Sequence, residues 1–413
     1  MKKTDFIRKR KLTFDLVIFF QLSLLQLSLQ SELNNFFKNL LNKTVPTQVV
    51  SDAALCKARK KCNPQAFAYL LHKLSALFYE HCPCSPRWKG FRLIAIDGTT
   101  LYLPPTENIY NAFGKKSENA SPYSLAQASF AYDPYSHVII DAQIDEYNQS
   151  EQNQFAAHTE HFSAGDLILA DRGYTGFWLM VLLMQKGCHF CIRHMAEKSL
   201  YKKITEFTAS GKKQQIVVLH PCKSAIKRLK ENNLPIEPIT VRLIRIELSS
   251  GETEVLVTDL LDEKDYPYQE FQALYHLRWP VEESYKSFKS KLNVENFTAK
   301  TADGIRMDFF AKAFMLSFAA VIEHAAQPML NEKKEKNENK RRKHPQQINR
   351  AGIHNVIKQT FVELFVKLSN IKKLIDDIIR AICQNTQPIR EGRAFKRKHK
   401  PSKRYYMTVK PSH

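Results

Sequence analysis

The chain has 413 residues and carries 62 Lys and Arg side chains against 41 Asp and Glu, which gives a formal net charge of +21. This length allows two to three domains with a substantial core, so folding does not need to depend on metal or disulfide staples. The positive charge recurs along the whole chain instead of collecting in one tail. It therefore predicts a polyanionic partner.

A membrane surface is the competing partner, because the chain begins with Lys2 and Lys3 and continues into an apolar run over residues 16–29. Polar residues interrupt that run and no small-residue cleavage site follows it, so it is too polar and too short to span a bilayer. Eight cysteines without regular spacing are typical of a reducing compartment. We therefore expect a cytoplasmic protein without a membrane anchor, and the spacing of Cys188 and Cys191 leaves a zinc site as an alternative to a buried strand.

Residues 1–85 are expected to form helices, since apolar positions recur at helical spacing and no strand-like alternation interrupts them. Ser51 is suited to cap a helix over residues 50–61, which follows an earlier helix and a turn. This pair resembles a two-helix DNA-docking unit, and its candidate DNA contacts are Lys57, Arg59 and Lys60. The alternative is a basic helix face that is only solvated.

From residue 86 to about residue 195 the pattern changes to short apolar strands that alternate with helices. The predicted strands are 92–97, 125–132, 137–144, 166–171 and 189–193, and the predicted helices are 150–161 and 177–186. Three strands, a helix, a strand, a helix and a strand predict a mixed α/β sheet with helices packed on it. This order of elements resembles that of a ribonuclease-H-like core.

Residues 196–265 have a different composition, with segments rich in Val, Ile and Thr that predict strands. The best candidates are 216–219, 239–248 and 254–260. We interpret this region as a β-strand insertion. Helical patterns return over residues 266–330. Residues 331–413 combine a charged linker (332–344), a helical region (353–383) and a basic tail (390–404) that is expected to stay disordered without nucleic acid.

Two aspartates each follow an apolar strand-like segment and precede a glycine: Asp97 stands before Gly98, and Asp171 stands two residues before Gly173. We expect both strands to end there. A carboxylate at a strand end can face a substrate while the sheet fixes its position. The alternative is that both are acidic residues of ordinary turns, where Asp is frequent.

A third acidic residue, Glu282, lies in a helix that is expected to begin at Pro280. Its apolar stripe consists of Val281, Tyr285, Phe288 and Leu292. Glu282 recurs with Lys286 and Lys289 on a neighbouring face, so one face suits the core and the other suits a charged ligand. The alternative is an intrahelical pair of Glu282 with Lys286, which is worth roughly a few tenths of a kcal/mol and leaves the other nearby cations unexplained.

These residues carry a resemblance to a known family. The order Tyr, two residues, Arg, three residues, Glu, six residues, Lys is the signature of DDE transposases of the insertion-sequence-four family. This chain has that spacing without adjustment, at Tyr275, Arg278, Glu282 and Lys289. It also resembles the family in Asp-Gly-Thr around Asp97, in Asp-Arg-Gly-Tyr around Asp171, and in a β insertion before the glutamate. The resemblance covers roughly residues 5–320, and three motifs in order make it specific.

The resemblance implies a ribonuclease-H-like core in which Asp97, Asp171 and Glu282 bind two Mg²⁺ ions, for which Mn²⁺ is expected to substitute. Hard cations prefer oxygen ligands. Two such ions, about 3.5 to 4 Å apart, can assist an in-line displacement at phosphorus. Water would first release a 3′-hydroxyl at the transposon end, and that hydroxyl would then attack target DNA.

Basic residues near the triad are expected to contact the phosphate backbone, because they would neutralise DNA charge; they are Arg278, Lys286 and Lys289. Tyr275 is expected to pack against sugar or phosphate. The implied partners are double-stranded DNA with terminal inverted repeats and target DNA, and synapsis of two ends implies at least a dimer, held at the nucleoid through DNA. The β insertion contains no Trp, so a hairpin step is left open.

We therefore expect a transposase that cleaves DNA at insertion-sequence ends and transfers the strands into target DNA. Two alternatives stay open: a metal-dependent nuclease with the same triad and no strand transfer, and a DNA-binding product of the element without catalysis. The predicted domains are a helical DNA-binding domain (1–85), a catalytic core in two parts (86–195 and 266–330), the β insertion between them (196–265) and a helical C-terminal region with a basic tail (331–413).

Overall fold

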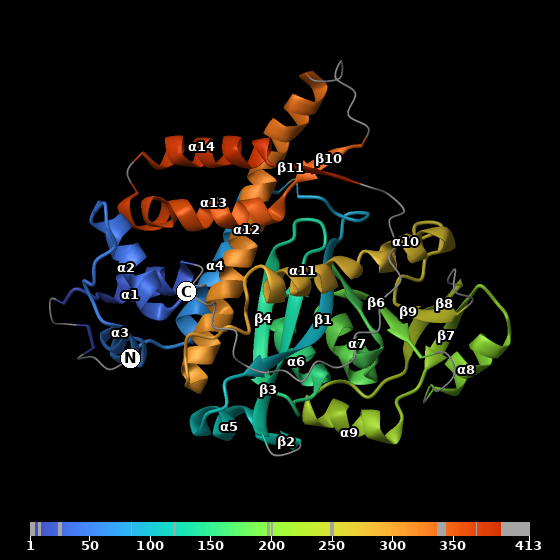
Figure 1. Ribbon diagram of the computed structural model, residues 1–413. Helices are drawn as coiled ribbons and strands as arrows, with labels where there is room; N and C mark the ends of the chain where they lie inside the picture. The colour runs from blue at the N-terminus through green and yellow to red at the C-terminus, as the bar shows by residue number, and fades with distance from the viewer. Residues whose placement is uncertain are drawn as a thin grey trace. The chain divides into compact units, whose positions relative to one another are not determined.

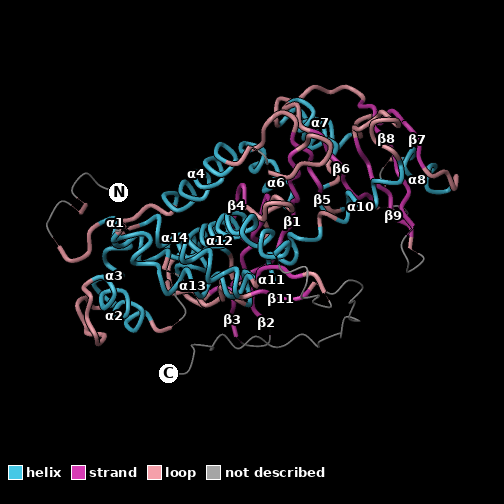
Figure 2. Tube along the Cα trace, turned by 90° about the horizontal axis from the view of Figure 1, so that it is seen from above, coloured by secondary structure: helices cyan, strands magenta, loops and turns pink. Residues whose placement is uncertain are grey.

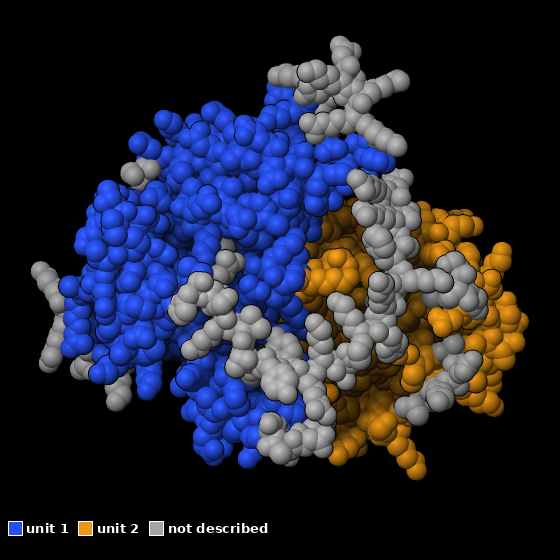
Figure 3. Space-filling model, in the orientation of Figure 1, with its two compact units in different colours: residues 1–74, 102–124, 287–413 blue, residues 75–101, 125–286 orange. Residues whose placement is uncertain are grey.

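The computed structural model describes residues 5–6, 10–23, 27–83, 85–118, 121–195, 199, 201–247, 252–336, 344–368 and 370–389. The chain divides into two compact units (Figure 3). Unit 1 comprises residues 1–74, 102–124 and 287–413, and unit 2 comprises residues 75–101 and 125–286. Among the described residues, no helix combines the length and the apolar character that crossing a membrane requires.

The main sheet has nine strands within the described residues, in the order β2-β3-β1-β5-β6-β9-β8-β7, with β4 paired to β3. The strands are β1 (Arg92–Leu103), β2 (Lys116–Glu118), β3 (Ser121–Tyr132), β4 (Ile139–Glu146), β5 (Asp166–Ala170), β6 (His189–His194), β7 (Gln214–Leu219), β8 (Ile239–Glu247) and β9 (Thr253–Thr258). β5 runs parallel to β1 and to β6, whereas β3 with β4, β6 with β9, β9 with β8 and β8 with β7 are antiparallel. The sheet is therefore mixed.

The order β4-β3-β1-β5-β6 within this sheet confirms the predicted ribonuclease-H-like core. Along the chain, these five strands occur in the order β1, β3, β4, β5, β6. Helix α6 (Glu151–His158) leads to β5, and helix α7 (Phe177–Gln185) leads to β6. The first strand of the core is therefore flanked by the second and the fourth, which is the arrangement that brings its residues next to those of β5.

Strand β1 is longer than the sequence predicts. The prediction ends it at Asp97, but it continues without interruption to Leu103. Gly98 is part of this extended strand and not of a turn. A Cβ at this position would lie 2.8 Å from Nε2 of Gln127 and 3.3 Å from Oη of Tyr174. The glycine thus permits close packing, and Asp97 projects from the middle of a strand.

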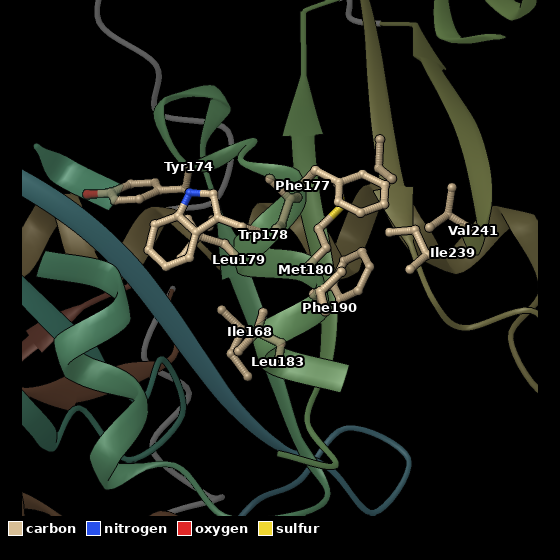
Figure 4. Packing of buried hydrophobic residues seen from close by; sticks show 14 of the residues in the cluster. Ile168, Tyr174, Phe177, Trp178, Leu179, Met180, Leu183, Phe190, Ile239 and Val241 are labelled. Carbon is tan, nitrogen blue, oxygen red and sulfur yellow. The ribbon is translucent and has the colours of Figure 1, made fainter. Parts of the chain in front are cut away.

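The core of unit 2 lies between the sheet and helix α7 (Figure 4). This helix has the sequence Phe-Trp-Leu-Met-Val-Leu-Leu-Met-Gln and buries residues on all its sides, as expected for a helix that is apolar all round. Its partners in the cluster include Ile168 of β5, Phe190 of β6, and Ile239 and Val241 of β8. Packing of this kind holds the parallel strands β5 and β6 in fixed positions.

Residues 196–265 contain the three predicted strands as β7, β8 and β9, and they also contain two helices that the sequence interpretation did not predict, α8 (Lys202–Ala209) and α9 (Lys223–Glu231). Each of these short helices buries only two residues, so its apolar signal is weak. β9 pairs with β6, with Val257 opposite Ile192. The insertion therefore extends the core sheet.

Unit 1 is mainly helical. Its helices are α1 (Phe14–Leu22), α2 (Leu29–Leu40), α3 (Asp52–Arg59), α5 (Glu107–Phe113), α12 (Ala302–Lys336), α13 (Arg350–Val362) and α14 (Ile371–Gln384), and α4 (Gln65–His81) begins within it. Ser51 caps α3 as predicted, accepting a hydrogen bond from the amide of Ala54 at 3.2 Å. α12, α13 and α14 pack against one another (Figures 1 and 2).

The C-terminal region differs from the prediction at one boundary. Helix α12 continues to Lys336, so the first residues of the expected charged linker, which was placed from residue 332, are helical. The helical segment predicted at 353–383 is present as α13, a five-residue π-helix (Glu363–Lys367) and α14. The remainder of the linker, 337–343, and the basic tail from Arg390 lie outside the described residues.

The buried carboxylate of Asp308 on α12 joins three segments of unit 1. It accepts a hydrogen bond from Nη2 of Arg59 at 2.8 Å, from the amide of Thr298 at 2.7 Å, and from the side chain of Gln21 on α1. A buried carboxylate requires such partners, because an uncompensated charge in the interior is costly. Arg59 is accordingly only 4% exposed, and it is an internal residue of unit 1.

Candidate active site

The two predicted aspartates lie side by side on neighbouring parallel strands. β1 and β5 pair in a register that places Ile96 opposite Ala170, so the next residue of each chain segment is Asp97 or Asp171. Adjacent strands lie roughly 4.8 Å apart, which brings the two residues to the same level of the sheet. Asp171 follows β5 directly and caps the short 3₁₀ turn Arg172–Tyr174.

Glu282 is joined to Asp97 by an arginine. Glu282 lies in the first turn of α11 (Trp279–Ser290), which follows α10 (Phe271–His276). Nη2 of Arg278 donates to Oε1 of Glu282 at 2.8 Å, and Nη1 of the same side chain lies 3.6 Å from Oδ2 of Asp97. The arginine side chain is 8% exposed, whereas the two carboxylates are 21% and 23% exposed. The acids remain open to solvent while their counter-charge is buried.

The apolar stripe of α11 fixes Glu282 in this position. Tyr285 donates its hydroxyl hydrogen bond to the backbone carbonyl of Asp97 at 2.7 Å, and its ring stacks on Phe130 of β3 with 4.6 Å between centroids. Val281 is fully buried, and the other two stripe residues, Phe288 and Leu292, are buried as predicted. The helix is therefore attached to β1 at Asp97 itself.

Arg193 on β6 is a site residue that sequence reasoning missed. Its Nη2 lies 2.7 Å from Oδ1 of Asp171, and its Nη1 pairs with Glu254 on β9. The predicted strands contain a signal that could have identified Arg193 as a partner of Asp171. Ala170 pairs with Ile192 across β5 and β6, so Arg193 follows its strand register as Asp171 follows that of β5. A basic residue of β6 at the level of Asp171 is thus expected to form an ion pair with that aspartate.

Negative charge is concentrated around Asp97. Burial raises the pKa of this carboxyl, the Arg278 guanidinium and the Gly98 amide lower it, and the charges of Glu282 and Asp171 raise it, with a net value of about 6. The amide of Gly98 donates to Oδ1 of Asp97 at 3.0 Å. Acids that repel one another in a partly buried site are suited to divalent cations, which prefer oxygen ligands. Among the described residues, the oxygens of the three acids do not all lie within 4.8 Å of one another, so joint binding of one ion requires side-chain rotation.

Several buried donors near the acids have no hydrogen-bond partner. They are Nε and Nη1 of Arg278 and the hydroxyl of Tyr275. The Arg278 guanidinium lies 5.7 Å from the centroid of the Tyr275 ring, and burial raises the pKa of that tyrosine. Unsatisfied donors beside a carboxylate cluster are suited to an anionic ligand such as a phosphate.

The remaining predicted DNA contacts divide by exposure. Lys286 is 62% exposed and pairs with Glu283. Lys289 lies near the end of the same helix, in the part of it that belongs to unit 1. Burial lowers the pKa of Lys289, and the charge of Glu295 offsets this only in part. Lys57 on α3 and Lys60, the C-cap residue of that helix, are exposed. Arg59 is the exception, because its buried ion pair with Asp308 removes it from the surface where a DNA contact was expected.

Comparison with known proteins gives matches that differ in coverage and in sequence identity. The family model described as Transposase DDE domain matches residues 88–318. The transposase InsG for insertion sequence element IS4 of Escherichia coli K12 is 26% identical over 258 residues, which cover 61% of this chain and 56% of that protein. A cryo-EM structure of a piggyBac transposase synaptic complex with hairpin DNA has 10% sequence identity and a TM-score of 0.44, and the match covers 89% of this chain and 76% of that chain.

The match to the family model contains the whole of the arrangement described above. Residues 88–318 include every strand of the main sheet, and they include Asp97, Asp171 and Glu282. The match covers more than half of the chain, whereas the alignment with InsG spans 56% of that relative. By this extent and by its ribonuclease-H-like core, the chain belongs to the transposase DDE domain family.

Proposed function

We propose that this chain is a DNA transposase in which Asp97, Asp171 and Glu282 hold divalent metal ions, Mg²⁺ in the cell and Mn²⁺ as a substitute. The observation that supports this most is the meeting of three distant segments. One guanidinium, that of Arg278, binds Glu282 and lies beside Asp97. Asp171 directly follows β5, whose last residue pairs with the residue before Asp97 on β1. Proteins with this domain use divalent ions.

The proposed reaction is an in-line displacement at phosphorus, carried out twice. A water oxygen attacks the phosphodiester at the element end, and the bond to the leaving 3′-oxygen breaks to give a free 3′-hydroxyl. That hydroxyl attacks a phosphodiester of the target and displaces the target 3′-oxygen. Bound divalent ions supply charge stabilisation for the attacking and the leaving oxygens. No covalent protein intermediate is required.

The protein's own groups would orient the acids and the phosphate. Arg193 and Tyr285 restrain Asp171 and the helix that carries Glu282, respectively. Nε of Arg278 and the hydroxyl of Tyr275, which have no hydrogen-bond partner, are suited to a non-bridging phosphate oxygen. In this proposal Lys286 and Lys289 contact the flanking phosphate backbone, since cations beside a cut site neutralise DNA charge.

The partner in this proposal is double-stranded DNA, as terminal inverted repeats and as target, in the bacterial cytoplasm. Residues 1–85 are proposed to recognise the repeats, and the exposed Lys57 of the capped helix α3 and its exposed C-cap residue Lys60 support this. Arg59 has no direct role in it, because its side chain is buried. Joining of two ends requires at least a dimer in the complex with DNA.

The central experiment compares cleavage and binding on one duplex that carries the terminal repeat from the DNA flanking the coding region. Asp97→Asn, Asp171→Asn and Glu282→Gln should each lower Mg²⁺-dependent nicking by on the order of a hundredfold or more, because the amide keeps the shape and loses the charge. Gel-shift affinity should change little. Glu283→Gln is the matched control, since Glu283 is exposed and adjacent in sequence to Glu282 on the same helix. A triad variant that cuts at the wild-type rate would remove that residue from the site.

A second assay separates a transposase from a nuclease with the same acids. The protein is given a pre-cut end with a free 3′-hydroxyl, together with supercoiled plasmid as target. A transposase joins the end to the plasmid in the presence of Mg²⁺, whereas a nuclease nicks repeat DNA in the first assay and joins nothing in the second. Binding without either reaction would favour a non-catalytic product of the element.

A further inference from the structure

A fourth carboxylate lies beside the two chain segments that carry the aspartates of the site. Glu151 is the first residue of α6, and its side chain occupies the space next to the glycine that closely follows each aspartate. A Cβ at Gly98 would lie 3.5 Å from Oε1 of Glu151, and a Cβ at Gly173 would lie 2.6 Å from Oε2. The carboxylate therefore reaches both aspartate-bearing segments at once.

Gly173 is explained by this carboxylate and by nothing else in its surroundings. Its φ angle does not lie in the left-handed region, so the backbone would accept another residue. The atoms within 4 Å of a Cβ at this position all belong to Glu151. The missing side chain thus leaves room for Oε2 of Glu151 two residues after Asp171.

The orientation of Glu151 is set by hydrogen bonds from the sheet. Nε2 of Gln127 on β3 donates to Oε1 of Glu151 at 3.2 Å. The backbone of Gln127 is in turn held by Gln154, whose Nε2 donates to the Gln127 carbonyl at 3.0 Å and to Oδ2 of Asp145 at 3.0 Å. The remaining oxygen, Oε2, faces Gly173. Glu151 is exposed, so solvent and ions can reach it.

The charge of Glu151 acts on the same tyrosine as the charge of Asp97. Burial raises the pKa of Tyr174, and the charges of Glu151, Asp97 and Asp171 raise it further. All three carboxylates therefore lie within electrostatic range of Tyr174.

We propose that Glu151 is a fourth carboxylate ligand of the metal site, binding a divalent ion together with Asp97 and Asp171 after side-chain rotation, because their oxygens do not all lie within 4.8 Å of one another. This inference rests on the proposed metal-dependent function. It assigns to α6 a role that neither the Tyr-Arg-Glu-Lys spacing nor the two aspartate motifs indicate. The role of Gly173 follows from it, because a side chain at this position would displace the ligand oxygen.

The test is a titration of the full-length protein with Mn²⁺ alone, in which free Mn²⁺ is measured by electron paramagnetic resonance. Glu151→Gln should weaken Mn²⁺ binding by on the order of tenfold, as for other changes around a metal site. Gly173→Ala keeps every charge, yet it should weaken binding by a similar factor, because its methyl group would push Oε2 away. The double variant should be no weaker than either single variant.

Glu160→Gln is the control, because Glu160 is an exposed residue of the turn that follows α6, and it should bind Mn²⁺ like the wild type. Wild-type affinity in Glu151→Gln would overturn the proposal. So would a loss in Glu151→Gln with no loss in Gly173→Ala, since this pattern indicates only a distant charge effect. Asp97→Asn and Asp171→Asn distinguish the two levels of proposal: wild-type Mn²⁺ binding in both would instead overturn the metal site itself.

Discussion

Arg193 and Asp171 form an ion pair with 2.7 Å between Nη2 and Oδ1. The same guanidinium pairs with Glu254 on β9, a strand of the region that was interpreted as an insertion. Burial lowers the pKa of Arg193 while Glu254, Tyr275 and Asp171 raise it, and the net pKa is raised. The insertion therefore takes part in orienting an acid of the core.

Arg193→Gln should lower the single-turnover cleavage rate by about tenfold without weakening Mn²⁺ binding. Loss of the guanidinium frees the Asp171 side chain, and small misplacements reduce rates strongly. Removal of a nearby positive charge does not disfavour a cation. Cleavage at saturating protein and a Mn²⁺ titration measure the two effects. An unchanged rate would show that Asp171 is positioned by its strand alone.

Asp97→Asn should stabilise the protein at high pH in the presence of a chelator. The folded carboxyl has a pKa of about 6, against an ordinary value of 3.8, so wild-type stability falls as the pH rises through that window. Above it, the variant should be more stable by about 2 to 3 kcal/mol, at about 1.4 kcal/mol per pKa unit. Below about pH 4 the difference should vanish. Urea unfolding across this pH range tests the prediction, and a difference that does not vary with pH would contradict it.

Arg278→Ala and Lys289→Ala should reduce the cleavage rate far more than the affinity for DNA ends. Arg278 bridges two of the acids, and an alignment error at the phosphate can cost on the order of a hundredfold in rate. A chain with 62 basic residues should lose little binding when one is removed. Lys286→Ala is the comparator, because Lys286 is exposed on the same helix. Equal losses of rate and affinity in all three variants would make these residues general DNA clamps.

The basic residues of α3 should separate into two classes. Lys57→Ala and Lys60→Ala should weaken binding to the terminal repeat, and the slope of the salt dependence should become shallower by about 0.9 for each phosphate that is no longer neutralised. Their unfolding free energies should stay within about 0.5 kcal/mol of the wild type. Arg59→Ala should instead destabilise the fold by about 3 to 5 kcal/mol, because it leaves the Asp308 carboxylate buried without its counter-charge. Thermal unfolding beside gel shifts at several salt concentrations distinguishes the two classes.

Local patterns in the sequence were sufficient for the fold of the core. An apolar run such as the one before Asp171 predicts a strand from only a few consecutive residues. The strands and helices predicted in this way around the aspartates are confirmed. The apolar stripe that begins at Val281 also indicated which face of α11 is buried. The strand end predicted at Asp97 was wrong, because a glycine in a strand resembles a turn until its neighbours Gln127 and Tyr174 are known.

The parts of the site that the sequence did not reveal depend on contacts between distant segments. Arg193 and Glu254 meet because β6 and β9 are neighbours, and no local spacing contains that information. Arg59 shows the same effect in the opposite direction. Its position among lysines predicts a surface residue, but Asp308, which lies on another helix, draws it into the interior of unit 1.

The contacts of Asp308 have a consequence for the exchange of parts between relatives. Its carboxylate binds α1 and α3 to α12, and Glu32 of α2 pairs with Lys358 of α13 at 3.0 Å. The N-terminal helices therefore cannot be exchanged independently of α12 and α13. A chimaera that takes its repeat-binding segment from a related element must also take the matching faces of α12 and α13, or Asp308 will be a buried anion without its counter-charge.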